Sequence, residues 1–273
     1  MLAGRVSQHV HVYLRWKYSY MCRVLLGMNS PASLDDIKIL YKSNNYIIVD
    51  KHYDVKINSD KAEDAVTVET QLAHLYPDLV DGQLCHSFRF VHRLDYSTSG
   101  VLCIALNKKA SAVGMEMFKD RKVTKQYLAL VRGHVTGDEL EVRRSIYQNP
   151  EEGLTHMMRV DDGRCPQGTR LLTALTRLQV VARGEYEGEP ATKVLLQPHT
   201  GRRHQLRVHC KSIGHPIVGD YTYSMRKDVS PYRMMLLAHR LVMPIPDENI
   251  DVTAEDVFTH SQDSKWMPYD DHR

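Results

Sequence analysis

The sequence predicts an α+β fold around a largely antiparallel sheet, and three observations support this prediction. Residues 37–41 and 46–50 are rich in β-branched and aromatic side chains and flank the turn-forming segment 42–45, as in a β-hairpin. Residues 101–106 form a short, continuously apolar run, which is typical of a buried strand. Between such runs, apolar residues recur at helical spacing. A mixture of hairpins and helices is typical of an α+β domain.

Two helices and one further strand are predicted in the first half of the chain. Residues 68–75 and 108–120 carry apolar side chains at helical spacing, and Thr67 is suited to cap the first of these helices. Residues 125–131 return to a strand pattern. Residues 134–170 are rich in charge, glycine and proline, so we expect an insertion or an irregular region there.

The second half of the chain is predicted to contain two strands and a helix. Residues 175–182 and 193–196 have strand patterns, and residues 183–190 are expected to connect them. A helix is expected to open at residues 200–201 and to end near Gly214.

Length and charge leave the partner open but locate a basic segment. The 273 residues suffice for one large domain or two small ones. The formal net charge of +3 is too small to indicate nucleic-acid binding by itself. Residues 190–219, however, contain no acidic residue and several basic ones, which are Lys193, Arg202, Arg203, Arg207 and Lys211. Such a segment fits a polyanionic partner, with an ordinary solvated surface as the equally weighted alternative.

Cysteine usage and hydropathy indicate an intracellular protein. The five cysteines are scattered and never spaced C-x-x-C, which argues against a disulfide framework and a structural zinc site. Reduced cysteines fit a cytoplasmic or nuclear location. No apolar run approaches the ~20 residues that a membrane span needs.

We divide the chain into a basic N-terminal extension (residues 1–34), a central domain (35–246) and a C-terminal tail (247–273). The extension has four basic residues and no acidic one, which is typical of a mitochondrial transit peptide. Three interpretations compete, with an unstructured extension ranked first and a transit peptide second. The third is an artefact of start-site choice, since Met28 is an internal methionine just before the central domain.

Asp95 lies in the most informative segment of the chain. It stands between Arg93 and a small polar turn that ends in Gly100, directly before the apolar run 101–106. Loops at the mouth of a sheet often carry functional residues. By itself, an aspartate in such a loop is more often a turn or cap residue.

Four segments resemble, in order, the motifs of the RluA-type RNA pseudouridine synthases. Residues 91–100 match the signature HRLDxxTSG. Residues 125–133 resemble KxYxAxVxG, residues 198–209 resemble PxTGRTHQLRVH, and residues 214–220 resemble GxPIxGD. The resemblance covers residues 36–246 and points to the eukaryotic RNA pseudouridylate synthase domain-containing branch.

This resemblance implies a fold and an activity. The fold would be a single catalytic domain with a mixed, largely antiparallel sheet, flanked by helices and loops, and an active-site cleft across the sheet. The activity would be the isomerisation of uridine to pseudouridine in RNA. A base inside a stack cannot be detached and rotated, so it must be flipped into a pocket.

The resemblance also implies three catalytic residues, Asp95, Arg207 and Tyr127. Asp95 would be the nucleophile, and whether it attacks C1′ of the sugar or C6 of the base stays open, as does a role in proton removal. A carboxylate in a dry pocket loses its charge unless a cation lies nearby, and Arg207 would be that cation. Tyr127 would stack on the uracil, with proton transfer as an open second role.

Four further residues are expected to bind RNA. Arg93 would fill the space left by the flipped nucleotide, because its planar guanidinium can stack and hydrogen-bond. Lys125, Arg202 and Arg203 would contact phosphates, which position RNA without selecting its sequence. Arg203 stands where the family usually has threonine, so it either adds a phosphate contact or disturbs the pocket wall.

The expected partner is RNA (tRNA, rRNA or mRNA), bound by a monomer. His204, His209 and Asp220 are expected to be framework residues. The sequence shows no metal-ligand cluster, and isomerisation exchanges no atoms with a cofactor, so we expect neither a metal nor a cofactor. The competing hypothesis is a non-catalytic RNA-binding protein or RNA chaperone that retains the fold, for which Arg203 is the best argument.

Overall fold

The protein is built on one mixed sheet. The structure is a computed structural model that describes residues 32–61, 63–246 and 248–269. Within these residues, eleven strands join one sheet, and its main path runs in the order β1-β2-β4-β11-β5-β10-β9-β13. The strands of this path are β1 (Lys38–Lys42), β2 (Tyr46–Lys51), β4 (Ser99–Ala105), β11 (Leu236–Ile245), β5 (Thr124–Arg132), β10 (Glu189–Pro198), β9 (Leu175–Tyr186) and β13 (Trp266–Pro268).

Three shorter strands extend this sheet at its sides, and a separate hairpin stands beside it. The side strands are β3 (Arg89–Phe90) on β4, β6 (Glu139–Arg143) on β9 and β12 (Glu248–Thr253) on β11. The hairpin consists of β7 (Ile146–Gln148) and β8 (Met158–Val160). Every named strand pair is antiparallel except β4 and β11, which confirms the mixed, largely antiparallel sheet that the sequence predicted.

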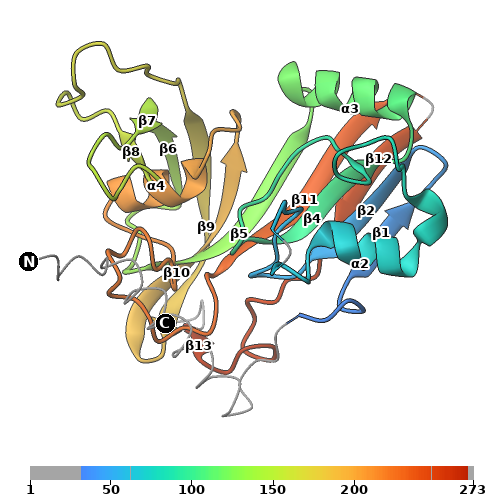
Figure 1. Cartoon of the computed structure of the whole chain (residues 1–273). Coiled ribbons are helices and arrows are strands. Elements are labelled where there is room, and N and C mark those ends of the chain that lie inside the picture. The colour runs from blue at the N-terminus through green and yellow to red at the C-terminus, as the bar shows by residue number, and fades with distance from the viewer. Residues whose placement is uncertain (1–31, 62, 247, 270–273) are drawn as a thin grey trace, which may run out of the picture.

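Helices flank the sheet at its two ends. They are α2 (Val68–Leu75), α3 (Lys108–Lys119), α4 (Gln205–Ser212) and the short 3-10 helix η1 (Pro77–Leu79). Figure 1 shows α4 and the β7–β8 hairpin at one end and α2 and α3 at the other, with β5 and β10 between them. None of the helices in the described part of the chain is long and apolar enough to cross a membrane.

The local signals for the first hairpin and for both early helices are confirmed. β1 and β2 pair in antiparallel fashion across the predicted turn. Thr67 caps α2 through a reciprocal pair of hydrogen bonds, because its hydroxyl accepts from the Thr70 amide and the Thr70 hydroxyl accepts from the Thr67 amide. Asn107 caps α3 with a single hydrogen bond, because its side-chain oxygen accepts from the Ala110 amide at 2.9 Å.

The prediction that residues 183–190 form a connection is wrong, because most of these residues belong to strands. β9 continues to Tyr186 and β10 begins at Glu189, which leaves only Glu187 and Gly188 as the turn. Both have positive φ angles, of 55° and 78°, as a two-residue hairpin turn requires. The backbone pairing of two long strands thus outweighs the polar composition that suggested a loop.

Two further expectations differ from the structure. Residues 134–170, expected to be irregular, contain β6, β7 and β8. The helix expected to open at residues 200–201 begins only at Gln205, because His204 adopts a left-handed backbone conformation with φ of 52° that ends any helical path before it.

The sheet also continues beyond the boundary drawn at residue 246. In β12, Ile250 and Val252 are buried while their neighbours face solvent, which is the period-two pattern of a half-buried strand. β12 pairs with β11 and β13 with β9, so part of the predicted C-terminal tail belongs to the sheet. The predicted N-terminal extension lies outside the described residues up to residue 31.

Candidate active site

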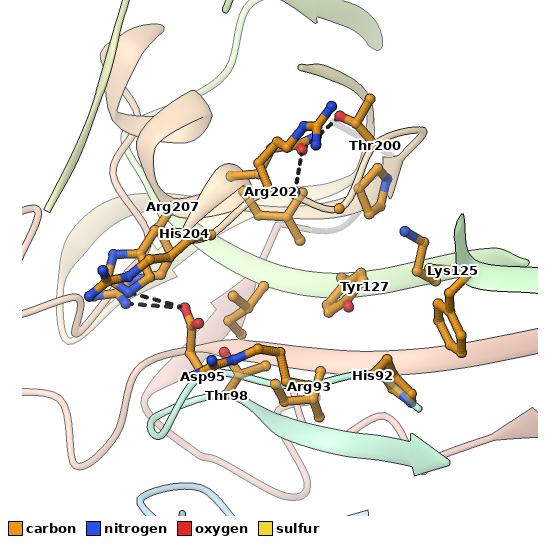
Figure 2. A pocket seen from close by; sticks show the side chains of 18 of the residues that line it. His92, Arg93, Asp95, Thr98, Lys125, Tyr127, Thr200, Arg202, His204 and Arg207 are labelled. Atoms are coloured by element: carbon orange, nitrogen blue, oxygen red, sulfur yellow. Dashed lines mark hydrogen bonds and ion pairs between the residues drawn. The ribbon is translucent and has the colours of Figure 1, made fainter. Parts of the chain in front are cut away.

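A cavity of about 560 Å³ opens between the two ends of the sheet (Figure 2). The loop before β4, strand β5 and the segment leading into α4 contribute its walls. The seven site residues predicted from the sequence all line this one cavity. They are Arg93, Asp95, Lys125, Tyr127, Arg202, Arg203 and Arg207.

Gly100 determines where the Asp95 loop joins the sheet. Its φ angle is +106°, and a Cβ atom at this position would lie 2.2 Å from the Ala238 carbonyl oxygen of β11. Only glycine can therefore occupy the position without moving one of the two strands. Because β4 and β11 pair in parallel here, the loop before β4 is held at the edge of the cavity.

Two buried basic side chains hold the Asp95 loop from behind. The Nζ atom of Lys51 is completely buried and donates to the carbonyls of His52, Val55 and Tyr96 at 2.9, 2.8 and 3.0 Å. Burial lowers the pKa of Lys51 to about 7. Arg233, also buried, donates to the Ser99 hydroxyl at the end of the loop. The sequence did not reveal either role, because both depend on burial by distant segments.

Arg207 connects Asp95 with a second aspartate. Its Nη1 atom lies 3.2 Å from Oδ2 of Asp95, and its Nε and Nη2 atoms donate to the two carboxylate oxygens of Asp220 at 2.7 and 2.9 Å. Burial alone would lower the pKa of Arg207, but the hydrogen bonds and charge of Asp220, with the charge of Asp95, outweigh it and raise that pKa. The guanidinium is thus a permanent cation with a fixed orientation.

His204 belongs to the cavity, although the sequence indicated only a framework role. Its Nε2 atom lies 3.9 Å from Oδ2 of Asp95, and its Nδ1 atom lies 3.2 Å from the Tyr223 hydroxyl. Burial lowers the pKa of His204, and Arg207 and Arg203 contribute to the same effect. The imidazole is therefore neutral near pH 7 and faces the carboxylate as a dipole. The left-handed backbone at this residue turns the ring toward Asp95, and no sequence pattern indicated that conformation.

Tyr127 and Lys125 lie along β5 on the floor of the cavity (Figure 2). Burial raises the pKa of the Tyr127 phenol, and the negative charge of Asp95 adds to the effect, so the phenol keeps its proton. Burial also lowers the pKa of Lys125, with a contribution from Arg121. The strand period of two places both side chains on the same face of the sheet.

The remaining predicted residues lie at the edge of the cavity. Arg93 and Arg203 have exposed side chains, while Arg202 is held by its Nε atom, which donates to the Thr173 carbonyl at 3.2 Å. Lys193, by contrast, is buried and bonded to the Asp256 carboxylate and the Phe258 carbonyl. The basic segment 190–219 is therefore not one charged surface, because the buried side chains of Lys193 and Arg207 are paired with Asp256 and Asp220.

Elsewhere in the described chain, one group of three side chains has the composition of a metal site. Ligand atoms of Asp60, Cys85 and His86 lie within 4.8 Å of one another. The sequence did not indicate this group, because Asp60 is distant in the chain from the other two. None of these residues lines the cavity, so the group takes no part in the chemistry proposed below.

Comparison with known proteins identifies the family. The family model for RNA pseudouridylate synthase matches residues 45–212. The chain is 52% identical over 242 residues to RNA pseudouridylate synthase domain-containing protein 1 of Danio rerio, covering 87% of this chain and 80% of the relative. It is 33% identical over 231 residues to the dual-specificity RNA pseudouridine synthase RluA of Escherichia coli, covering 81% and 94%.

A solved structure agrees with these sequence matches. The human RNA pseudouridylate synthase domain containing 1 structure superposes with a TM-score of 0.77 at 41% identity, covering 88% of this chain and 92% of that one. The resemblance read from the four motifs is thereby confirmed, and so is the single-domain fold that it implied. The chain belongs to the RNA pseudouridylate synthase family.

Proposed function

We propose that this RNA pseudouridine synthase flips its target uridine into the cavity and uses Asp95 as the nucleophile. The observation that carries the proposal is the position of Asp95, which is partly exposed to the cavity and in contact with the Arg207 guanidinium. A carboxylate with a fixed cation beside it and an open face toward a cavity is suited to nucleophilic attack.

The reaction exchanges one bond to the sugar for another. The bond between N1 of uracil and C1′ breaks, the base rotates, and a bond between C5 and C1′ forms. C5 loses its hydrogen as a proton and N1 gains one, so no atom or electron is exchanged with a cofactor. Asp95 can act by attacking C1′, with the electron pair of the broken bond leaving on uracil, or by adding to C6 of the base.

The cavity has the size and surfaces that a flipped nucleotide needs. Its volume of about 560 Å³ lies in the usual range for small-molecule sites. Tyr127 offers an aromatic face, and stacking on such a face stabilises a base by about 1–3 kcal/mol. Arg207 and the neutral His204 both face Asp95, so the carboxylate keeps a fixed position during the rotation of the base.

The cationic residues at the edge are placed to hold the RNA backbone. Arg93, Arg202 and Arg203 surround the opening, and Lys125 lies deeper on β5. Contacts of this kind position the strand without reading its sequence. The class of RNA is set by features other than these charges.

The test is a comparison of the wild-type protein with Asp95→Asn. Cellular RNA labelled with tritium at C5 of uridine releases tritium when the new carbon–carbon bond forms. We expect release by the wild type and none above background by Asp95→Asn, with similar RNA affinity and melting temperature. Substantial release by the variant would refute the role of Asp95. No release by either protein from any cellular RNA would favour a non-catalytic RNA-binding protein.

A further inference from the structure

We infer that a second cavity, next to the active site, binds the base of a nucleotide adjacent to the target uridine, with Tyr96 as the stacking surface. This inference rests on the proposed function, because it assumes that RNA enters the first cavity. The second cavity has a volume of about 540 Å³, which is large enough for a nucleobase and its sugar.

The two cavities share a wall. His92, Arg93 and Leu94 line both of them, so a strand that leaves the active site on this side passes directly over Arg93. Arg93 has an exposed side chain, and Figure 2 shows that it comes from the same loop as Asp95. An RNA strand with one base in each cavity would place its intervening phosphate near this guanidinium.

The position of Tyr96 suits it to hold a base in the second cavity. It follows Asp95 directly in the chain, yet it lines the second cavity and not the first. Tyr96 is 37% exposed, so part of its surface is accessible to a base in this cavity. Its carbonyl accepts a hydrogen bond from the buried Lys51 Nζ atom at 3.0 Å, so the backbone that carries the ring is fixed.

The other walls of the second cavity suit a base and its backbone. Phe90, Ile57 and Leu94 provide apolar surface, and Asn58 provides an amide that can both donate to and accept from a base edge. Lys56 is 41% exposed and paired with Asp64. The ion pair is partly exposed and a single pair of this kind contributes about 1 kcal/mol or less, so the ammonium group can turn to a phosphate.

The same loop therefore carries two functions on consecutive residues. Asp95 faces the uridine that reacts, and Tyr96 holds its neighbour. Because the loop is anchored by Lys51 at Tyr96 and by Arg233 at Ser99, the distance between the two sites is fixed before RNA binds. Stacking on Tyr96 would help to keep the strand open while the uridine is outside the stack.

The experiment measures binding of short RNA by an Asp95→Asn protein, in which no conversion takes place during the measurement. The probes are the heptamer AAAUAAA, whose single uridine fixes the register, and four derivatives with one abasic nucleotide at either of the two positions on each side of the uridine. Each is titrated against Asp95→Asn alone and in combination with Tyr96→Ala, Tyr96→Phe or Tyr96→Trp.

We expect Tyr96→Ala to weaken binding of the intact heptamer between roughly fivefold and a hundredfold, as the loss of a base–aromatic stack does. An abasic nucleotide at one of the four positions should weaken binding to the Asp95→Asn protein with Tyr96 intact by a similar factor. The same probe should bind the Tyr96→Ala protein as tightly as the intact heptamer does. Tyr96→Phe should bind like the parent, and Tyr96→Trp at least as tightly, which a misfolded protein would not do. Tyr269→Ala, at an exposed tyrosine that lines neither cavity, is the matched control.

Three results would overturn the inference. One is unchanged binding by Tyr96→Ala, and another is a loss that is equal for all four abasic probes. The third is no measurable binding of the heptamer by the Asp95→Asn protein. The proposed function is tested separately by tritium release. The catalytic role of Asp95 can therefore be refuted while stacking on Tyr96 is confirmed, and stacking on Tyr96 can be refuted while the role of Asp95 is confirmed.

Discussion

Nη1 of Arg207 lies 3.2 Å from Oδ2 of Asp95, although the two residues are 112 positions apart in the chain. Nε and Nη2 of the same guanidinium donate to Asp220, which is almost completely buried. The orientation of the arginine is thus set by Asp220, and its cationic edge is presented to Asp95. Asp220 acts as a positioning residue for the cavity without touching it.

Asp220→Asn should therefore reduce activity without removing any group that lines the cavity. The amide keeps the shape of the side chain but cannot accept both hydrogen bonds from Arg207, so the guanidinium moves relative to Asp95. A displacement of about 1 Å can reduce kcat by about 100-fold. Breaking a buried ion pair also costs on the order of 3 kcal/mol of folding stability. Tritium release and urea denaturation measure the two effects.

The matched control for Asp220→Asn is Asp251→Asn. Arg240 donates through Nε and Nη2 to both oxygens of Asp251, which is the same bidentate arrangement at the surface. Both side chains are 41% exposed, so the change should cost less than about 1 kcal/mol and leave kcat unaltered. Equal effects of the two substitutions would contradict the positioning role of Asp220.

The sequence predicted the residues that line the cavity better than the buried residues that hold the Asp95 loop in place. Short motifs identified Asp95, Tyr127 and Arg207 because each residue stands in a recognisable local pattern, and the structure brings these three into one cavity. Lys51 and Arg233 were not found, because their importance arises from burial behind the loop. No pattern of neighbouring residues encodes that burial.

The same distinction applies to the fold. Thr67 and Asn107 act within a few residues of themselves, so the starts of α2 and α3 agree with sequence expectations. Residues 183–186 are polar and looked like a connection, but they pair with β10 across the sheet. α4 begins only after His204, because this residue has a left-handed backbone. That conformation can be expected from sequence at glycine and asparagine, but not at histidine.

A pair of substitutions at His204 should separate its two contacts. Asparagine reproduces the reach of Nδ1 and tolerates the left-handed backbone. His204→Asn should therefore keep the contact with Tyr223 and the melting temperature of the wild type. It lacks the nitrogen that faces Asp95, so kcat should fall roughly fivefold, which corresponds to about 1 kcal/mol. His204→Gln reproduces the reach of Nε2 and should show the smaller loss of activity. Tritium release and thermal melting of both variants decide the outcome, and the opposite order would exclude a role for the Asp95-facing nitrogen.

Lys51 should make stability depend on pH in a defined direction. Burial lowers its pKa from 10.5 to about 7. Between these values the unfolded chain holds the proton and the folded protein does not, so the free energy of unfolding rises with pH through this window. The rise is at most about 1.4 kcal/mol per pH unit.

Lys51→Met removes this titration together with the contacts of Nζ to the carbonyls of His52, Val55 and Tyr96. The variant should be less stable than the wild type at pH 7, and the difference should be larger at pH 9.5. Urea denaturation at both pH values measures it, with Lys109→Met, at an exposed residue of α3, as the control for removal of a surface charge. A difference between Lys51→Met and wild type that does not change with pH would show that Lys51 keeps its proton in the folded protein.

Arg203 should contribute to RNA binding through phosphate alone. It is exposed at the edge of the cavity, and its positive charge contributes to lowering the pKa of His204. Arg203→Gln should weaken binding to different RNA sequences about equally and reduce the slope of log affinity against log salt by about 1. Arg177→Gln is the control, because Arg177 is 63% exposed, pairs with Glu141 and lies outside the cavity. Filter binding at several salt concentrations with two unrelated RNAs measures the slopes. An unchanged slope for Arg203→Gln with lost tritium release would instead assign Arg203 to the wall of the uridine pocket.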